Sequence, residues 1–257
     1  LIATLPSGDV AVLNPRNGEV RHQQTLPGGT IAGALCRAAG PETGPPAYFG
    51  DRGAGIWSLI AADRKLELVP WQALTVRRDE TLVAALRTIG PDPHQPPLLV
   101  VCPTGDYARD RGAVCALAPD GVRWRLPIGG AIWGTPAVAD LSGDGIPELI
   151  VTSIEPRPAG RAVGMLTVVS AAGHILQRIE LETPIECSPV VADVNGDNRL
   201  EVLVAEQSGL LHCYATPGYG PVEWGLFGGD SHNTRNATNA YAYGQTLFGR
   251  QWQWKPE

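Results

Sequence analysis

The 257-residue sequence predicts an all-β protein built from repeated four-stranded units. Short apolar runs rich in Val, Ile and Leu are bounded by Gly, Pro, Asn and Asp, which is typical of strands joined by turns. No stretch of the sequence combines a helical period with helix caps. The same order of runs and turns recurs at an interval of about 50 residues, which indicates a repeat architecture.

Two markers define the repeat. The residue at the start of the second strand recurs at steps of 51, 50 and 53 residues: Pro46, Pro97, Pro147 and Leu200. The glycine that opens the third strand recurs at steps of 47, 57, 52 and 45 residues: Gly8, Gly55, Gly112, Gly164 and Gly209. Because the two markers share nearly one period, the repeat belongs to whole units and not to a single motif.

Four strands in about 50 residues, with no helix, are the signature of a β-propeller blade. A single blade leaves both of its apolar faces exposed, and packing blades around an axis buries them. We therefore predict a β-propeller of four-stranded blades over residues 1–230, of which about five blades are visible. The first blade is incomplete, and the blades occupy residues 1–28, 29–73, 74–129, 130–184 and 185–230.

The tail at residues 231–257 contains alternating aromatic residues and leaves two alternatives open. It can supply the strand that the first blade lacks and so close a small ring, since open sheet edges favour aggregation. Alternatively, the chain is part of a larger propeller whose earlier blades precede this sequence or lie on another chain. The entry in mid-blade and the absence of an initial Met favour the second alternative.

Composition excludes several classes of protein. The chain has 20 basic and 26 acidic residues, a net charge of −6 and no stripe of Lys and Arg, so nucleic acid is not expected as a partner. No apolar run is long enough to span a membrane, and a hydrophobic fraction of 44% is too high for a disordered chain. The five cysteines lie in apolar, strand-like stretches and are expected to be buried thiols, with a Cys102–Cys115 bridge as the alternative.

Two short acidic loops, at residues 140–148 and 193–201, carry the clearest chemistry. Each places an acid at position 1, a small oxygen donor at 3, Gly at 4, Asp at 5 and Glu at 9. Calcium takes about six to eight oxygen ligands, and alternate side chains of a tight loop can converge on one ion. We therefore expect two Ca²⁺ sites, in which position 7 offers its backbone carbonyl. The first comprises Asp140, Ser142, Asp144, Ile146 and Glu148, and the second comprises Asp193, Asn195, Asp197, Arg199 and Glu201.

The turn residues of these loops fit the same prediction. Gly145 and Asn198, at position 6, suit a left-handed backbone, and Gly143 and Gly196 permit a sharp bend. The alternative is a pair of metal-free hairpin turns rich in Asp, Asn and Gly. The equivalent loops at residues 37–46 and 87–97 lack the acids and are expected to bind no metal.

The stretches PAVADLSGDGIPELIV and PVVADVNGDNRLEVLV resemble the FG-GAP/VCBS repeats of β-propellers, as in integrin α-subunit heads and many bacterial surface proteins. The resemblance covers mainly residues 130–230. It implies calcium at the side chains of positions 1, 3, 5 and 9 of each loop, where the ion has a structural role. The segments DVAVLNPRNGEV and GAVCALAPDGVRW are also similar to the repeats of quinoprotein-type propellers.

Candidate partner contacts lie on other loops. In a propeller, the connections between second and third strands lie on the face opposite the acidic loops. Two of them, at residues 104–111 and 154–161, are long, and long loops on a rigid scaffold commonly bind partners through Arg and Tyr. The alternative is that they are ordinary solvated insertions. The candidate contact residues are Asp106, Tyr107, Arg109, Arg111 and Arg157.

The function predicted from these features is non-catalytic. The sequence contains no motif of a serine hydrolase, zinc protease or nucleotide-binding enzyme, and His212 is expected to be a satisfied core residue. We predict a calcium-stabilised interaction or adhesion module that binds another protein or a protein-borne glycan. Extracellular calcium fills sites with a Kd of about 10⁻⁴–10⁻³ M, so the expected location is extracytoplasmic: secreted, periplasmic or cell-surface. The alternatives are a propeller domain of a polysaccharide-active or quinoprotein-like enzyme, and a subunit of a larger assembly.

Overall fold

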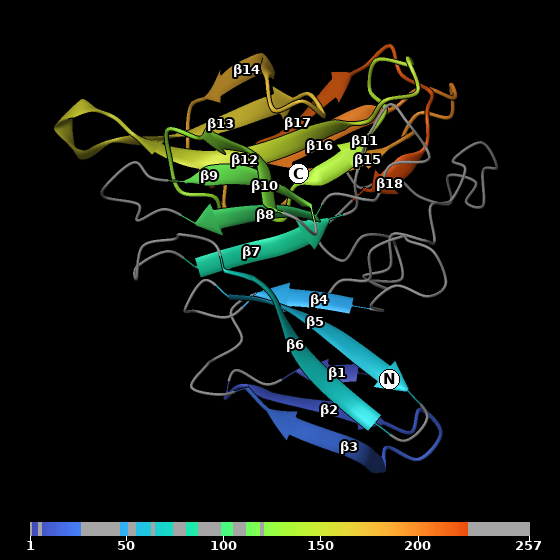
Figure 1. The fold of residues 1–257 in the computed structure, drawn as a ribbon. Coiled ribbons are helices and arrows are strands. Elements are labelled where there is room, and N and C mark those ends of the chain that lie inside the picture. Colours follow the sequence, from blue (N-terminus) through green and yellow to red (C-terminus); the bar gives the residue numbers. More distant parts are fainter. Residues whose placement is uncertain are drawn as a thin grey trace.

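The computed structural model describes residues 2–4, 7–26, 47–50, 55–62, 65–73, 81–86, 99–104, 112–118 and 121–225. Within these residues the one helical element is a 3-10 turn at Pro158–Gly160, and every other element is a β-strand (Figure 1). The all-β prediction is therefore confirmed for the described part of the chain.

The strands form five antiparallel sheets that follow one another along the sequence and are stacked as successive layers (Figure 1). The first sheet contains β1 (Ile2–Thr4), β2 (Asp9–Leu13) and β3 (Val20–Thr25), and the second contains β4 (Ala47–Gly50), β5 (Gly55–Ala62) and β6 (Lys65–Ala73). The third contains β7 (Thr81–Leu86), β8 (Leu99–Thr104), β9 (Ala113–Ala118) and β10 (Gly121–Pro127). The fourth contains β11 (Ala137–Ala139), β12 (Glu148–Pro156), β13 (Ala162–Val169) and β14 (Ile175–Leu181), and the last contains β15 (Val190–Ala192), β16 (Glu201–Ala205) and β17 (Leu211–Ala215).

Within each sheet, consecutive strands are hydrogen-bonded neighbours, as in the meander of a propeller blade. Neighbouring sheets also meet through short strands: β4, which follows Pro46 and so stands at the second-strand position of the repeat, contacts β7, and the first strands β11 and β15 contact each other. Of the connections between first and second strands, the structure describes two, at residues 140–147 and 193–200.

The strand β18 (Val222–Trp224) does not extend the sheet that precedes it. The blade assignment from the sequence places these residues in the last blade, but Val138 of β11 pairs with Trp224. The next residue, Gly225, accepts a hydrogen bond from Val191 N–H of β15 through its carbonyl, at 2.8 Å. The segment therefore joins the first strands of the last two sheets.

The core follows from the burial of β12 on both faces. Leu149 and Val151 belong to a cluster shared with Leu117 of the third sheet, whereas Ile150 belongs to a cluster shared with Val202 of the last sheet. Alternate side chains of a strand point to opposite faces, so one strand serves two cores. Each fully buried side chain of this kind contributes roughly 1.5–3 kcal/mol.

Two leucines at the same repeat position differ in exposure between the fourth and the last sheet. Leu166 pairs with Thr152, four residues after Glu148, and Leu211 pairs with Ala205, four residues after Glu201. The two leucines are thus equivalent in the repeat, yet Leu166 is 2% exposed and Leu211 is 65% exposed. The last sheet covers the face of Leu166, while Leu211 lies on a face open to solvent.

Two of the expected buried cysteines are confirmed as buried thiols. Cys102 and Cys115 are both inaccessible to solvent and are not bridged, and burial raises the pKa of the Cys102 thiol well above its usual range. Cys213 is exposed, so the expectation is wrong there, and Cys187 is half-buried. Cys36 lies outside the described residues.

A tryptophan links the third and fourth sheets at their outer edges. Trp124 Nε1 donates to the carbonyl of Ala171 at 3.0 Å, in the turn between β13 and β14. Gly173 of the same turn has φ +84°, and a Cβ at this position would lie 2.6 Å from the indole ring of Trp124. Glycine is therefore required here both by the backbone conformation and by the close approach of the ring.

Replacing Gly173 by Ala is expected to lower the Tm more than the matched replacement Gly18→Ala. Gly18 has a similar φ of +73° but no atom within 4 Å of an added Cβ. Both variants carry the left-handed strain of about 1–2 kcal/mol, and displacing the indole adds roughly 1–3 kcal/mol for Gly173→Ala. At about 2–4 °C per kcal/mol, circular dichroism melting curves will resolve the difference. Equal losses for the two variants would show that the indole contact stabilises nothing.

Candidate metal centre

Both acidic loops are hairpin tips between the first and second strands of their sheets. The first joins β11 to β12, with Ala139 opposite Glu148, and the second joins β15 to β16, with Ala192 opposite Glu201. Position 1 of each loop therefore directly follows a strand, and position 9 begins the next one. This shared register brings the carboxyl groups of positions 1 and 9 to the same end of each hairpin.

The carboxylates of the first loop hold its backbone in place. Asp140 accepts the N–H of Gly143 at 2.7 Å through Oδ1 and the N–H of Gly145 at 2.9 Å through Oδ2. Asp144 Oδ1 accepts the N–H two residues ahead at 2.8 Å. Glu148 Oε2 reaches back from position 9 to the N–H of Leu141 at 2.8 Å.

The second loop repeats this pattern bond for bond. Asp193 accepts the N–H of Gly196 at 2.6 Å and that of Asn198 at 2.9 Å. Asp197 Oδ1 accepts the N–H two residues ahead, and Glu201 Oε2 accepts the N–H of position 2 at 2.9 Å. The four backbone positions expected to bend all have positive φ: Gly143 (81°), Gly145 (86°), Gly196 (81°) and Asn198 (66°).

Two of the three acids of the first loop are buried. Asp140 is 3% exposed and Glu148 is 6% exposed, whereas Asp144 lies at the surface. Burial raises the pKa of the Glu148 carboxyl, the charges of Asp144 and Asp140 raise it further, and the hydrogen bond from Leu141 opposes the rise. A cation between these groups would relieve their repulsion.

In the second loop, the side chain at position 3 joins the carboxylates of positions 5 and 9. Asn195 Nδ2 donates to Asp197 Oδ2 at 3.2 Å and to Glu201 Oε1 at 3.0 Å. Two carboxylates from different parts of the loop thus face the same partially positive group. The two carboxylates offer oxygens, which fit a hard cation and not a thiophilic metal, whereas Asn195 turns its amide nitrogen toward them and its Oδ1 accepts the N–H of Asp197.

No three His, Cys, Asp or Glu side chains among the described residues already stand at metal-binding distances from one another. In this structure the carboxylates of the two loops hold backbone N–H groups of the turns. The loops at residues 37–46 and 87–97, expected to bind no metal, lie outside the described residues.

Of the candidate partner contacts, the structure places Arg157 alone. Asp106, Tyr107, Arg109 and Arg111 lie outside the described residues.

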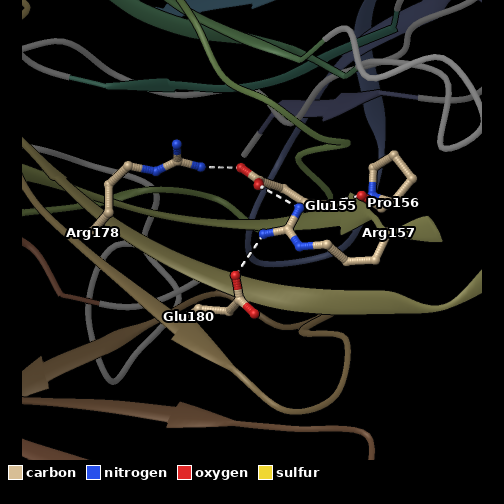
Figure 2. A network of polar contacts seen from close by, with 5 residues as sticks. All are labelled: Glu155, Pro156, Arg157, Arg178 and Glu180. Carbon is tan, nitrogen blue, oxygen red and sulfur yellow. Dashed lines mark hydrogen bonds and ion pairs between the residues drawn. The ribbon is translucent and has the colours of Figure 1, made fainter.

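Figure 2 shows that the Arg157 guanidinium is held within its own sheet. It pairs with Glu180 at 2.6 Å and with Glu155 at 3.2 Å, and Arg178 pairs with the other oxygen of Glu155. The Glu155 side chain is 7% exposed, so two guanidinium groups compensate one buried carboxylate. The Arg157 side chain keeps 32% exposure, so it is partly accessible at the surface.

Outside the two acidic loops and the Arg157 cluster, a further buried carboxylate, Glu206, was not anticipated from the sequence. Its Oε2 accepts both the backbone N–H of Thr183 at 2.7 Å and the hydroxyl of Thr183 at 2.6 Å, and its Oε1 contacts His212 Nε2. These bonds connect the end of β16 to the segment that enters the last sheet. His212 is satisfied, as expected, but its side chain is 30% exposed and so lies outside the core. The position of His212 in a strand is the one sequence feature that bears on the Glu206–His212 pair.

The hydrogen bonds from Thr183 lower the pKa of Glu206, with His212 acting in the same direction and burial opposing it. Glu206 therefore stabilises the fold above the pKa of the unfolded chain, and this contribution is lost as the pH falls through the lower folded value. Replacing Glu206 by Gln is expected to lower the Tm at pH 7 and to have progressively less effect in acid, as melting curves across that range will show. Exposed Glu182→Gln is the matched control, and a loss that does not depend on pH would contradict this role.

No protein-family model matches the chain, and no curated protein matches it. Among solved structures, Saccharomyces cerevisiae Sqt1 aligns with a TM-score of 0.51 at 13% identity, over 86% of this chain and 61% of Sqt1. Weaker alignments are to BBS1N in complex with ARL6DN (TM-score 0.39, 13% identity, 86% of this chain and 78% of that one) and to BamB from Moraxella catarrhalis (TM-score 0.32, 12% identity, 86% and 83%).

The Sqt1 alignment confirms the predicted β-propeller fold. This chain spans about three fifths of the length of Sqt1. No helix in the described residues is long and apolar enough to cross a membrane.

Proposed function

We propose that this chain is a non-catalytic β-propeller module that binds a protein, or a glycan carried by one, and that two calcium ions stabilise it outside the cytoplasm. The observation that carries the proposal is the matched pair of hairpin tips. Two loops separated by one repeat share acids at the same offsets, the same backbone hydrogen bonds and the same positive-φ residues. A turn alone needs one or two such residues, so the remaining carboxylates call for another role.

Calcium is the cation that these donors suit best. Carboxylate, amide, hydroxyl and carbonyl oxygens are its ligands, and it tolerates the irregular geometry that a short loop provides. Magnesium demands near-ideal octahedral coordination and keeps several waters. The first site would use Asp140, Ser142, Asp144, Glu148 and the carbonyl of Ile146, and the second would use Asp193, Asn195, Asp197, Glu201 and the carbonyl of Arg199.

The exposure of the loops supports the proposed location. Asp144, Asp193 and Asp197 are reached by solvent, so binding competes with hydration and is expected to be of the millimolar class seen in extracellular modules. Such sites fill where calcium is abundant. This supports a secreted, periplasmic or cell-surface setting.

The described polar groups support binding over catalysis. Glu155 is neutralised by two arginines and Glu206 is held by Thr183 and His212, so neither carboxylate is poised as a general acid or base. The runner-up proposal is a propeller domain of a polysaccharide-active or quinoprotein-like enzyme. A glycan or quinone that binds near the first strands and is turned over would favour the enzyme.

Removing calcium is expected to lower the Tm. Ligand at 100 times its Kd stabilises a folded protein by about 2.7 kcal/mol per site, which corresponds to roughly 5–10 °C for a chain of this size. Scanning calorimetry with CaCl₂ and with EDTA measures the difference. A double variant with Asp144→Asn and Asp197→Asn keeps both turn hydrogen bonds but removes both charges. It should abolish the Tm difference between CaCl₂ and EDTA. Glu182→Gln should retain it, and magnesium should not replace calcium. Identical Tm values for the wild type in CaCl₂ and EDTA would refute the metal sites.

The open face of the last sheet supports membership of a larger assembly. Leu211 and Cys213 lie on this face, and Leu166, at the equivalent position of the fourth sheet, is covered by a neighbouring sheet. We infer that the occupant is a further propeller sheet, because this is what covers the same face one repeat earlier. An exposed apolar sheet face of this kind is otherwise an aggregation hazard.

Thiol labelling followed by peptide mass spectrometry tests this contact. In the isolated 257-residue chain, Cys213 is expected to react rapidly with a maleimide, and buried Cys115 is expected to be protected. When the protein is labelled in an extract of the cells that naturally produce it, Cys213 should be protected as well. Equal labelling of Cys213 in both preparations would mean that no sheet covers this face.

A further inference from the structure

The segment Thr216–Gly225, called the strap below, crosses both acidic loops on its way from β17 to the end of β18. The Gly218 carbonyl accepts the N–H of Leu200, at position 8 of the second loop, at 2.9 Å. Three residues later, the Pro221 carbonyl accepts the N–H of Asp140, at position 1 of the first loop, at 3.3 Å. The strap then pairs with β11 as β18. It is therefore in contact with the backbone of both candidate sites.

Two glycines allow the strap to approach Asp140. A Cβ at Gly220 would lie 2.4 Å from Oδ2 of Asp140, and a Cβ at Gly218 would lie 2.3 Å from its carbonyl oxygen. Neither glycine is among the residues with positive φ, so the backbone conformation does not demand them. The requirement is one of space, because a side chain larger than hydrogen would displace the carboxylate or the strap.

This contact distinguishes the two loops. Asp140 is 3% exposed beneath the strap, whereas the equivalent Asp193 is half-buried. Both oxygens of Asp140 already hold backbone N–H groups of the loop, so any shift of the carboxylate would disturb the whole turn.

We propose that Gly220 is a positioning residue for the cation-binding carboxylate of Asp140, so that the affinity of the first site, but not that of the second, depends on the seating of the strap. This inference rests on the calcium binding proposed above. Groups that orient a metal ligand typically alter metal affinity about 10–100-fold when they are changed. By linkage, calcium in the first site should in turn hold β18 against β11.

Isothermal titration with CaCl₂ tests the inference on the full chain. The wild type should bind two ions, and Gly220→Ala should weaken one of them by about tenfold or more. In an Asp197→Asn background, which leaves only the first site, Gly220→Ala should weaken the single remaining ion. Gly209→Ala is the control: its φ of +88° makes alanine straining, but no atom lies within 4 Å of the added Cβ, so both affinities should be retained.

The outcomes separate the two proposals. A wild type that binds no calcium would refute the metal sites themselves. Two sites of unchanged affinity in Gly220→Ala would leave the metal sites standing and refute the role of the strap.

Hydrogen exchange on the wild-type chain gives an answer even if Gly220→Ala does not fold. Calcium should slow exchange of the β18 amides, Asp144→Asn should remove this protection, and Asp197→Asn should preserve it. Protection of β18 that survives Asp144→Asn would refute the link.

Discussion

The structure depends on one constraint: a sheet whose two faces are both apolar must be covered on both sides. β12 shows this directly, because Leu149 and Val151 pack toward the third sheet while Ile150 packs toward the last. No two-layer arrangement satisfies such a strand, whereas a stack of similar sheets does. The contact of Trp124 with Gly173 follows from the same packing, since the outer edges of two sheets must stay in register if their inner faces are to interdigitate.

This packing also explains why the acidic loops can hold their shape. Glu148 and Glu201 are the first residues of β12 and β16, whose side chains pack in the core. The packing of these strands therefore fixes the positions of the two carboxylates. The hydrogen bonds from Asp140 and Asp193 to backbone N–H groups then define the turn without a metal. What the turn does not explain is the remaining charge around Glu148, where burial and two aspartates disfavour ionisation. A divalent cation would offset the unfavourable free energy of ionising Glu148 beside these aspartates, and the turn itself does not require this charge.

The sequence predicted the features that local chemistry controls. Strand positions, hairpin tips and the left-handed residues Gly145 and Asn198 are all set by short-range pattern and turn preference. The pairing of β18 with β11, the contact of Glu206 with Thr183 and the ion pair of Arg157 with Glu180 were not predicted. Each joins segments that lie far apart along the chain, and a period of two residues or of about 50 residues does not reveal such a partner. The exposure of Leu211 escaped prediction because its neighbours in sequence match those of a buried strand.

The repeat therefore determines the strands of each sheet but not which segment packs against its faces. Leu166 and Leu211 occupy the same repeat position, and only the presence of a following sheet makes one a core residue and the other a surface residue. The same reasoning applies to the two loops, which share their hydrogen bonds but differ in cover, because the strap lies on Asp140 and leaves Asp193 more open. Copies of one motif become different in this way without any change in the motif: the segments that pack against each copy, and not the motif alone, decide how buried its carboxylates are.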